Sequence, residues 1–441
     1  MPSKGRLQVK VYKGDSYIPI NNARITIAPR DQAGQNYKLN TDSSGQTSEI
    51  EVTAPDIQLS MSPTGKNPYD LYDIIVEAPG FKSIKVQGCQ VYPEVLALQE
   101  CNMETTTSRQ VDQEIIDILP NTLVGKYPAK IPEAPIKPEN SSSGFVVLNQ
   151  VVIPEFIVVH AGDPNDTGVS DYKVRYKNYI KNVASCEIFS TWPENTIRAN
   201  ILCIISFTLN RIYTEWYRNK GKNFQITSST AYDHAFIYGR NIYANISNIV
   251  DQIFATYCKR PGVKQPLLTQ YCDGTTVSCP NWLTQWGSKY LGDQGLSPIQ
   301  ILTHYYGTDL SLTTATAVPG VPSSYPGYVL GIGSSGPNVS KVQTYLNKIS
   351  ENYPAIPKVP VNGVYGKSTY DVVKLFQETF NLTPSGTVNY ATWYKISDIY
   401  VAVTQIGELR GIEGTFIPPL NFEEIGRESS QKVPKVKYIV D

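Results

Sequence analysis

The sequence has little of the chemistry that builds metal clusters or disulfide scaffolds. Its 441 residues include only three histidines and seven cysteines. The cysteines are too few and too irregularly spaced for a disulfide framework. They are Cys89, Cys101, Cys186, Cys203, Cys258, Cys272 and Cys279. Lysine plus arginine and aspartate plus glutamate both total 39, so no overall charge favours nucleic acid or an anionic membrane as a partner.

Long apolar segments are also missing. No run of about 18 apolar residues occurs, so no transmembrane segment is predicted. The first residues, MPSKGRLQVKVY, lack the apolar core of a secretory signal, and we expect synthesis without an ordinary signal peptide. Tyrosine, by contrast, is abundant, with 30 residues against 12 phenylalanines and 5 tryptophans. Its apolar face and polar tip suit carbohydrate surfaces as well as half-buried core positions.

Residues 1–103 have the pattern of an all-β sandwich. Leu7, Val9 and Val11 alternate with polar residues, and similar short runs follow between turn sequences. The other alternating positions are Ala23, Ile25, Ile27, Ile50, Val52, Tyr72, Ile74 and Val76. The runs NNARITI, TDSSGQTSEIEV and YDIIVEAPGFKSIKV resemble the small transthyretin-like or carboxypeptidase-regulatory sandwich. This resemblance implies a role in folding, docking or masking.

Residues 104–150 are rich in proline and end in a serine-glycine stretch. Spaced prolines predict an extended, solvated tether, and the serine-glycine end predicts an accessible protease target. The prolines are Pro120, Pro128, Pro132, Pro135 and Pro138. Two interpretations stay open, a passive linker or a pro-segment cut between about Ser143 and Val151. The predicted cleavage region includes Gly144, Leu148, Asn149 and Gln150.

A buried helix is predicted at the centre of residues 151–312. Thr191 has the properties of an N-cap, Pro193 fits the first turn, and Glu194 lies three residues after the threonine. The following residues, Ile197–Ile212, are too apolar on all sides for a surface helix. We therefore expect an α+β, mainly helical domain around this helix, with further helices over residues 245–257 and from Pro298 to His304.

Glu194 is the predicted catalytic acid. We expect it at the mouth of the buried helix, against Trp192 and near Trp216, where an apolar setting keeps a carboxyl group protonated. The alternative is that Glu194 only completes a capping box with Thr191. Other candidate acids are Glu187, Asp233 and Asp273.

Three segments of this domain resemble the catalytic domain of the stage II sporulation protein D family of lytic transglycosylases. They are TWPENTIRANIL, SSTAYDHAFIYGR and LTQWGSKYLGDQGLSPIQILTHYYGT. Counted from Trp192, the family's glutamate falls on Asn195, and the resemblance carries the catalytic role to the adjacent Glu194. It also implies a sugar groove, although the aromatic residues could equally be core residues. The implied substrate-binding residues are Trp192, Asn195, Gln285, Trp286, Tyr305 and Tyr306.

No cofactor is predicted. Cys258, Cys272 and Cys279 with His234 or His304 could suggest zinc, but their spacing matches no compact two-cysteine motif. A Cys272–Cys279 disulfide or buried thiols are the alternatives. No Ser-His-Asp, phosphate-binding or dinucleotide signature is present.

A helical repeat pattern occupies residues 328–402, after a linker over 313–327. Val339, Val342 and Leu346 would share one helix face, and the set Val372, Val373, Phe376 and Phe380 would share another. The NGVYG, FQ and TW elements resemble the three-helix peptidoglycan-binding domain type 1. The pattern supports no assignment for the tail, residues 403–441.

The whole chain is therefore predicted as multidomain, with an N-terminal all-β sandwich, a central α+β domain and a C-terminal three-helix domain. This order resembles the clostridial spore cortex-lytic enzymes that are made as proenzymes. The resemblance implies a zymogen at the spore cortex, activated by a subtilisin-like germination protease. It also implies cleavage of the MurNAc–GlcNAc bond of cortex peptidoglycan by one carboxylic acid, with a 1,6-anhydro product. A muramidase and a non-catalytic wall-binding or spore-assembly protein are the alternatives.

Overall fold

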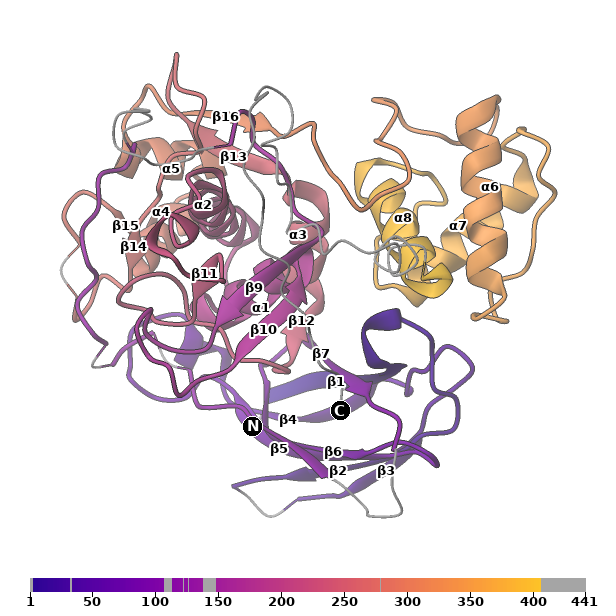
Figure 1. Ribbon diagram of the computed structural model, residues 1–441. Helices are drawn as coiled ribbons and strands as arrows, with labels where there is room; N and C mark the ends of the chain where they lie inside the picture. The colour runs from indigo at the N-terminus through magenta and orange to yellow at the C-terminus, as the bar shows by residue number, and fades with distance from the viewer. Residues whose placement is uncertain are drawn as a thin grey trace, which may run out of the picture.

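A computed structural model describes residues 3–31, 34–106, 113–121, 123–125, 127–137, 148–277 and 279–405. Figure 1 shows a body of strands at the N-terminal end, a central domain built around helices, and three further helices toward the C-terminal end. The predicted β-rich beginning and helical C-terminal region are thus confirmed.

The N-terminal strands form two sheets, in the orders β3-β2-β5-β6-β8 and β12-β7-β1-β4, where β12 (Ile242–Tyr243) is contributed by the central domain. The strands of this region are β1 (Ser3–Lys13), β2 (Arg24–Pro29), β3 (Tyr37–Asn40), β4 (Ile50–Ala54), β5 (Asp70–Glu77), β6 (Ser83–Val91), β7 (Leu96–Met103) and β8 (Gln113–Asp117). Leu7, Val9 and Val11 of β1 are fully buried, as are Ile27 and Ile74 of the other sheet. The predicted alternation therefore places one face of each sheet in a shared core.

The central domain surrounds helix α2 (Glu194–Tyr213). Every residue of α2 except Glu194, Asn195 and Arg198 is buried, as its apolar composition predicts. The other helices are α1 (Tyr176–Glu187), α3 (Ala244–Ile253), α4 (Gln285–Asp293) and α5 (Pro298–Tyr306). The strands are β9 (Phe156–His160), β10 (Asp171–Arg175), β11 (Ile226–Thr227), β12 (Ile242–Tyr243), β13 (Thr256–Lys259), β14 (Tyr271–Cys272), β15 (Leu283–Thr284) and β16 (Ser311–Thr314).

Two predictions about the start of α2 are wrong. Pro193 is the N-cap and Thr191 does not cap the helix, because its hydroxyl donates a 2.7 Å hydrogen bond to Ser60 Oγ of the N-terminal region. Trp216 lies beyond the far end of α2, whose 20 residues span about 30 Å. It is therefore not near Glu194. The predicted start of α5 is confirmed, since Ser297 and Gln300 form a capping box there.

The N-terminal region is joined to the central domain by hydrogen bonds within one sheet. Strand β12 pairs with β7 through Ile242 and Leu98, and Asn241 exchanges two hydrogen bonds with the backbone of Gln90. All of these residues except Ile242 are buried. The two regions therefore share a continuous interface rather than a loose hinge.

The predicted solvated tether is instead a strap that lies along the central domain. We define the strap as the described residues 113–121, 123–125 and 127–137. It begins as β8, which pairs in parallel with β6, and then follows the outside of the central domain (Figure 1). Its backbone bonds to that domain at several points, such as Ile131 N–H to Ala231 O and Leu268 N–H to Pro135 O. The prolines keep the strap extended, but the central domain holds it in place.

The C-terminal domain consists of α6 (Pro337–Ser350), α7 (Lys367–Thr379) and α8 (Tyr390–Thr404). The predicted helix faces are buried in it, which confirms both of them. The domain rests on its neighbours through polar contacts: Tyr353 donates to Tyr17 O at 2.6 Å, and Lys177 pairs with Asp398. None of the helices in the described ranges has the length and apolarity needed to span a membrane.

Candidate active site

The surroundings of Glu194 differ from those predicted. Its side chain is 68 % exposed, and its carboxylate forms a 2.7 Å ion pair with Arg198, one turn further along α2. The apolar setting expected for a proton donor is therefore absent at Glu194.

Three of the predicted sugar-binding residues are committed to internal contacts. Trp192 is buried and donates to Ser60 O at 2.8 Å. The Asn195 amide donates to Gly292 O and Leu296 O, tying the start of α2 to α4. Tyr306 is buried and donates to Gln270 O. Asn195 and Tyr306 therefore hold the central domain together, and Trp192 ties it to the N-terminal region.

Trp286 and Tyr305 are half-buried beside them. The Trp286 indole packs against Trp192, with ring centroids 5.1 Å apart, and its N–H donates to Leu123 O of the strap at 2.9 Å. The Tyr305 hydroxyl lies 3.1 Å from Thr284 Oγ1. The strap thus occupies the polar edge that Trp286 would otherwise offer to a ligand.

The structure brings Gln285 against Glu187, an acid that the sequence pattern marks only as an alternative. Glu187 is the last residue of α1 and is 8 % exposed. Its Oε1 accepts the Ala235 N–H at 2.7 Å, and its Oε2 accepts the Gln285 side-chain N–H at 3.1 Å. Gln285 also donates to Glu187 O at 2.6 Å. One glutamine at the start of α4 therefore fixes both the backbone and the carboxylate of Glu187.

Glu187 opens into a cavity that the strap closes. Gln285, Tyr271 and Asp273 line it from the central domain, and Tyr127 and Lys130 line it from the strap. The remaining lining residues are Asn121, Leu123, Pro128, Cys186, Thr230, Ala235, Cys272 and Val277. The free space is about 50 Å³, enough for a few water molecules but not for a sugar ring.

Lys130 is the cation of this cavity. Its ammonium donates to Asp233 O at 2.9 Å and lies 5.0 Å from the centre of the Tyr271 ring. Burial lowers the pKa of Lys130, and the nearby carboxylates of Glu187 and Asp233 oppose that shift. The strap therefore brings a positive charge to the cavity that contains Glu187.

The other two candidate acids accept hydrogen bonds within the fold. Burial alone would raise the pKa of Asp273, but hydrogen bonds from Thr275 and Thr276 lower it below its usual value. Asp233 is fully buried and accepts from Arg211, Tyr217 and Thr227 at 2.6–2.8 Å. Asp233 is enclosed by these partners, whereas Asp273 lines the same cavity as Glu187 and is held by the threonines of its own loop.

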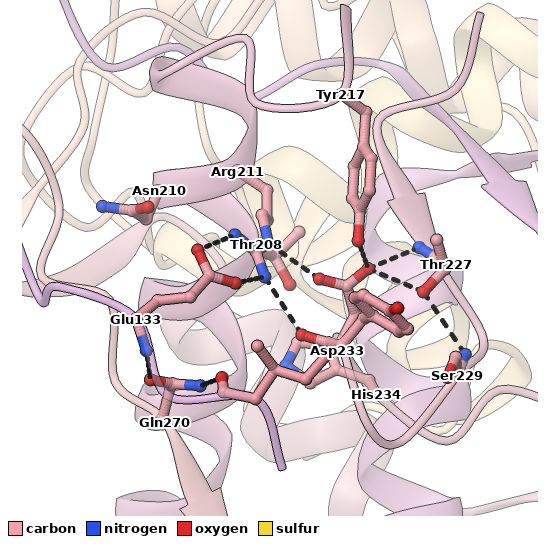
Figure 2. Close-up of polar contacts among 12 residues, drawn as sticks. Glu133, Thr208, Asn210, Arg211, Tyr217, Thr227, Ser229, Asp233, His234 and Gln270 are labelled. Carbon is pink, nitrogen blue, oxygen red and sulfur yellow. Dashed lines mark hydrogen bonds and ion pairs between the residues drawn. The ribbon is translucent and has the colours of Figure 1, made fainter. Parts of the chain in front are cut away.

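Asp233 and the strap meet at Arg211. Figure 2 shows Asp233 on one side of the buried Arg211 guanidinium and Glu133 of the strap on the other. The two Glu133 oxygens accept from Arg211 at 2.6 and 2.9 Å, which is a bidentate pair. This contact anchors the strap next to the Glu187 cavity.

Cys272 and Cys279 form a disulfide, which was one of the predicted alternatives to zinc. Neither sulfur is then a free thiolate for a metal. Cys258 is buried. Among the residues that the structure describes, no group of three or more His, Cys, Asp or Glu side chains is arranged to hold a metal ion.

The predicted cleavage region is only partly described. Gly144 lies outside the described residues. Leu148 is buried and its N–H donates to Tyr213 O, whereas Asn149 and Gln150 are exposed. Residues 151–154 are buried again. Within the described part of this region, Asn149 and Gln150 are therefore the positions that a protease can reach.

Comparison with known families assigns the C-terminal domain. Residues 335–396 match the family described as "Putative peptidoglycan binding domain". No curated protein matches the chain. The match covers α6, α7 and the first part of α8, so the predicted three-helix peptidoglycan-binding domain is confirmed. The chain therefore carries a peptidoglycan-binding domain.

Similarities to solved structures are weak. The chain is 12 % identical to 3-chlorocatechol 1,2-dioxygenase from Rhodococcus opacus 1CP, covering 26 % of this chain and 60 % of that one at a TM-score of 0.16. It is 10 % identical to the Bacillus anthracis TIE protein, covering 40 % and 26 % at a TM-score of 0.17. The chain thus spans only part of either protein's length, and at these TM-scores the similarities support no conclusion.

Proposed function

We propose that this protein cleaves the glycan strands of peptidoglycan as a lytic transglycosylase, with Glu187 as the single catalytic acid and base. The observation that supports this most is a buried carboxylate, held by the Gln285 amide, at the edge of a cavity in the central domain. The peptidoglycan-binding domain of the same chain supplies the substrate class. Glu194, the acid predicted from the sequence, lies in solvent.

The proposed reaction needs one carboxyl group in two roles. Protonated Glu187 gives its proton to the glycosidic oxygen while the bond from that oxygen to the muramyl anomeric carbon breaks. The muramyl 6-hydroxyl then attacks the anomeric carbon, and its proton passes to the Glu187 carboxylate. The product is a 1,6-anhydro sugar, and no second carboxylate is needed, unlike in the paired-acid hydrolases. Gln285 fixes the direction of the Glu187 side chain throughout.

In this proposal the uncut chain is inactive because the strap covers Glu187. The strap leaves no room for a sugar at Glu187 and brings the Lys130 ammonium into the same cavity. We propose that proteolysis at Asn149–Gln150 or in the preceding residues starts activation. The subtilisin-like germination protease and the spore cortex remain part of the proposal through the family resemblance.

Two other functions are compatible with the peptidoglycan-binding domain. A muramidase would use water in place of the 6-hydroxyl, at the same Glu187. A non-catalytic wall-binding or spore-assembly protein would need only the C-terminal domain as its ligand site.

Mass spectrometry of the products separates these functions. The full chain, carrying an engineered protease site at Asn149–Gln150, is cut and incubated with purified cortex peptidoglycan. We expect anhydro-muramyl ends from the cut chain and few from the uncut chain. Reducing muramyl ends would indicate a muramidase. If the cut chain released no products, the result would favour the non-catalytic wall-binding protein.

A further inference from the structure

Two buried glutamines of the central domain bind the strap backbone in the same way. Gln265 accepts the Lys137 N–H at 2.9 Å and donates to Lys137 O at 2.8 Å. Gln270 accepts the Glu133 N–H and donates to Ile131 O, both at 2.8 Å. Each side-chain amide therefore uses its donor and its acceptor together on backbone amide groups of the strap. The glutamines are 1 % and 2 % exposed, so both contacts are shielded from water.

A third contact adds a carboxylate to this pattern. The side chain of Glu133, whose N–H binds Gln270, forms a bidentate pair with Arg211 (Figure 2). The guanidinium keeps Asp233 as a second partner, so Arg211 stays paired whether or not Glu133 is present. The surface under the strap thus recognises amide groups flanking a carboxylate.

Peptidoglycan offers the same groups. Each amino sugar carries an acetamido group, which has one N–H and one C=O like a backbone amide, and the muramyl lactyl group and stem peptide carry carboxyl groups. A plain glucan has neither feature. The chemistry that holds the strap therefore matches an N-acetylated, acid-bearing glycan.

We infer that residues 127–137 of the strap fill the glycan-binding groove of this enzyme and imitate its ligand, with Gln265 and Gln270 as acetamido-binding residues and Arg211 as a carboxylate-binding residue. This rests on the proposed function. The groove is continuous with the catalytic cavity, because Tyr271 follows Gln270 and lines the cavity together with Lys130 and Glu187. The glycan and the strap would then exclude each other, and removing the strap uncovers both the groove and Glu187.

A binding experiment on the full chain tests this inference without any need for catalysis. Lys130→Ala/Glu133→Gln removes two strap contacts. The matched control is Ala129→Ser/Ala134→Ser, which changes two neighbouring strap positions whose side chains are exposed.

Hydrogen exchange first verifies that the amides of residues 127–137 have become less protected in the strap-weakened chain and not in the control. If they have not, Ile131→Pro is added, because it removes the N–H that bonds to Ala231 O. The probes are the hexamer of N-acetylglucosamine and its de-N-acetylated form.

The strap-weakened chain is expected to bind the N-acetylated hexamer about ten-fold more tightly than the wild type or the control, since a competing occupant has been loosened. The hexamer should protect amides of residues 265–272, and Gln270→Leu in the same background should cancel the gain. Protection confined to residues 335–396, or a gain that survives Gln270→Leu or the loss of the acetyl groups, would overturn the inference. If the cut chain cleaves glycan but the hexamer does not protect the amides of residues 265–272, the inferred groove is wrong and the proposed function stands. If the hexamer protects these amides but the cut chain cleaves no glycan, the proposed function is wrong and the groove stands.

Discussion

The end of α1 and the beginning of α2 carry two glutamates only seven positions apart, in opposite environments. Glu187 is buried, clamped by Gln285 and covered by the strap. Glu194 is mostly in solvent and pairs with an arginine of its own helix. The partners of Glu194 are local, whereas those of Glu187 come from elements far away in the sequence. The comparison shows that tertiary neighbours, rather than the local sequence pattern, decide which of the two carboxylates is buried.

The largest stability effect is expected where a buried carboxylate meets a buried cation. Arg211→Met leaves Glu133 and Asp233 without their common partner, and we expect a loss of about 3–5 kcal/mol in unfolding free energy. Arg198→Met is the matched control at the exposed pair with Glu194. Urea denaturation of both variants measures the contrast. Equal losses of unfolding free energy in the two variants would contradict the distinction between the buried pairs of Arg211 and the exposed pair of Arg198.

Gln285→Leu tests whether the contact with Gln285 distinguishes Glu187 from Glu194. The variant removes the amide that donates to Glu187 Oε2, so the carboxyl group loses its fixed direction. We expect glycan cleavage by the cut chain to fall by about 10–100-fold, with a stability loss of about 1–3 kcal/mol for the unpaired polar group. Gln285→Glu, which keeps the shape but not the donor, should not restore the activity. Unchanged cleavage rates in the leucine variant would show that Gln285 does not position the acid.

Lys10 is a second buried charged group, and its effect on stability should depend on pH. Lys10 of β1 is 3 % exposed at the contact with the C-terminal domain, and burial lowers its pKa to about 7. In the unfolded chain a lysine has a pKa of about 10.4. Between these values the unfolded chain binds more protons, so Lys10 makes stability rise with pH across that window. Denaturation at pH 7, 8.5 and 10 should show this rise, and Lys10→Met should flatten it. The same slope in the methionine variant would rule out Lys10 as the source.

The smallest effect is expected at Glu194. Its exposed pair with Arg198 should contribute no more than about 0.5 kcal/mol. Glu194→Gln should therefore leave the unfolding midpoint within experimental error of the wild type. A clear destabilisation would mean that this end of α2 depends on the ion pair after all.

Features that arise from local pattern were predictable from the sequence. The alternating strands, the buried α2 and the helix faces of the C-terminal domain follow from composition and periodicity, and the α5 capping box lies within four residues. Thr191 also has the local signature of a cap, but Ser60, 131 positions away, takes its hydroxyl. A single sequence contains no signal for that contact.

The contacts of the strap and the burial of Glu187 could not be predicted for a related reason. Prolines predict an extended chain, but only the fold reveals that Gln265 and Gln270 lie under it, 128 to 139 positions away. Glu187 ends a helical pattern like many surface acids, and its partner Gln285 is 98 positions away. The sequence did name Glu187 as a candidate. Its burial, which distinguishes it from Glu194, needs the tertiary structure.

The central claim is that Glu187, and not Glu194, is the acid of a peptidoglycan-cleaving site. The most direct test compares Glu187→Gln and Glu194→Gln in the cut full chain, by counting anhydro-muramyl ends released from cortex peptidoglycan per enzyme. The account predicts that Glu187→Gln releases almost none, while Glu194→Gln releases about as many as the parent chain and both variants stay folded. Full activity of Glu187→Gln, or loss of activity only in Glu194→Gln, would contradict it.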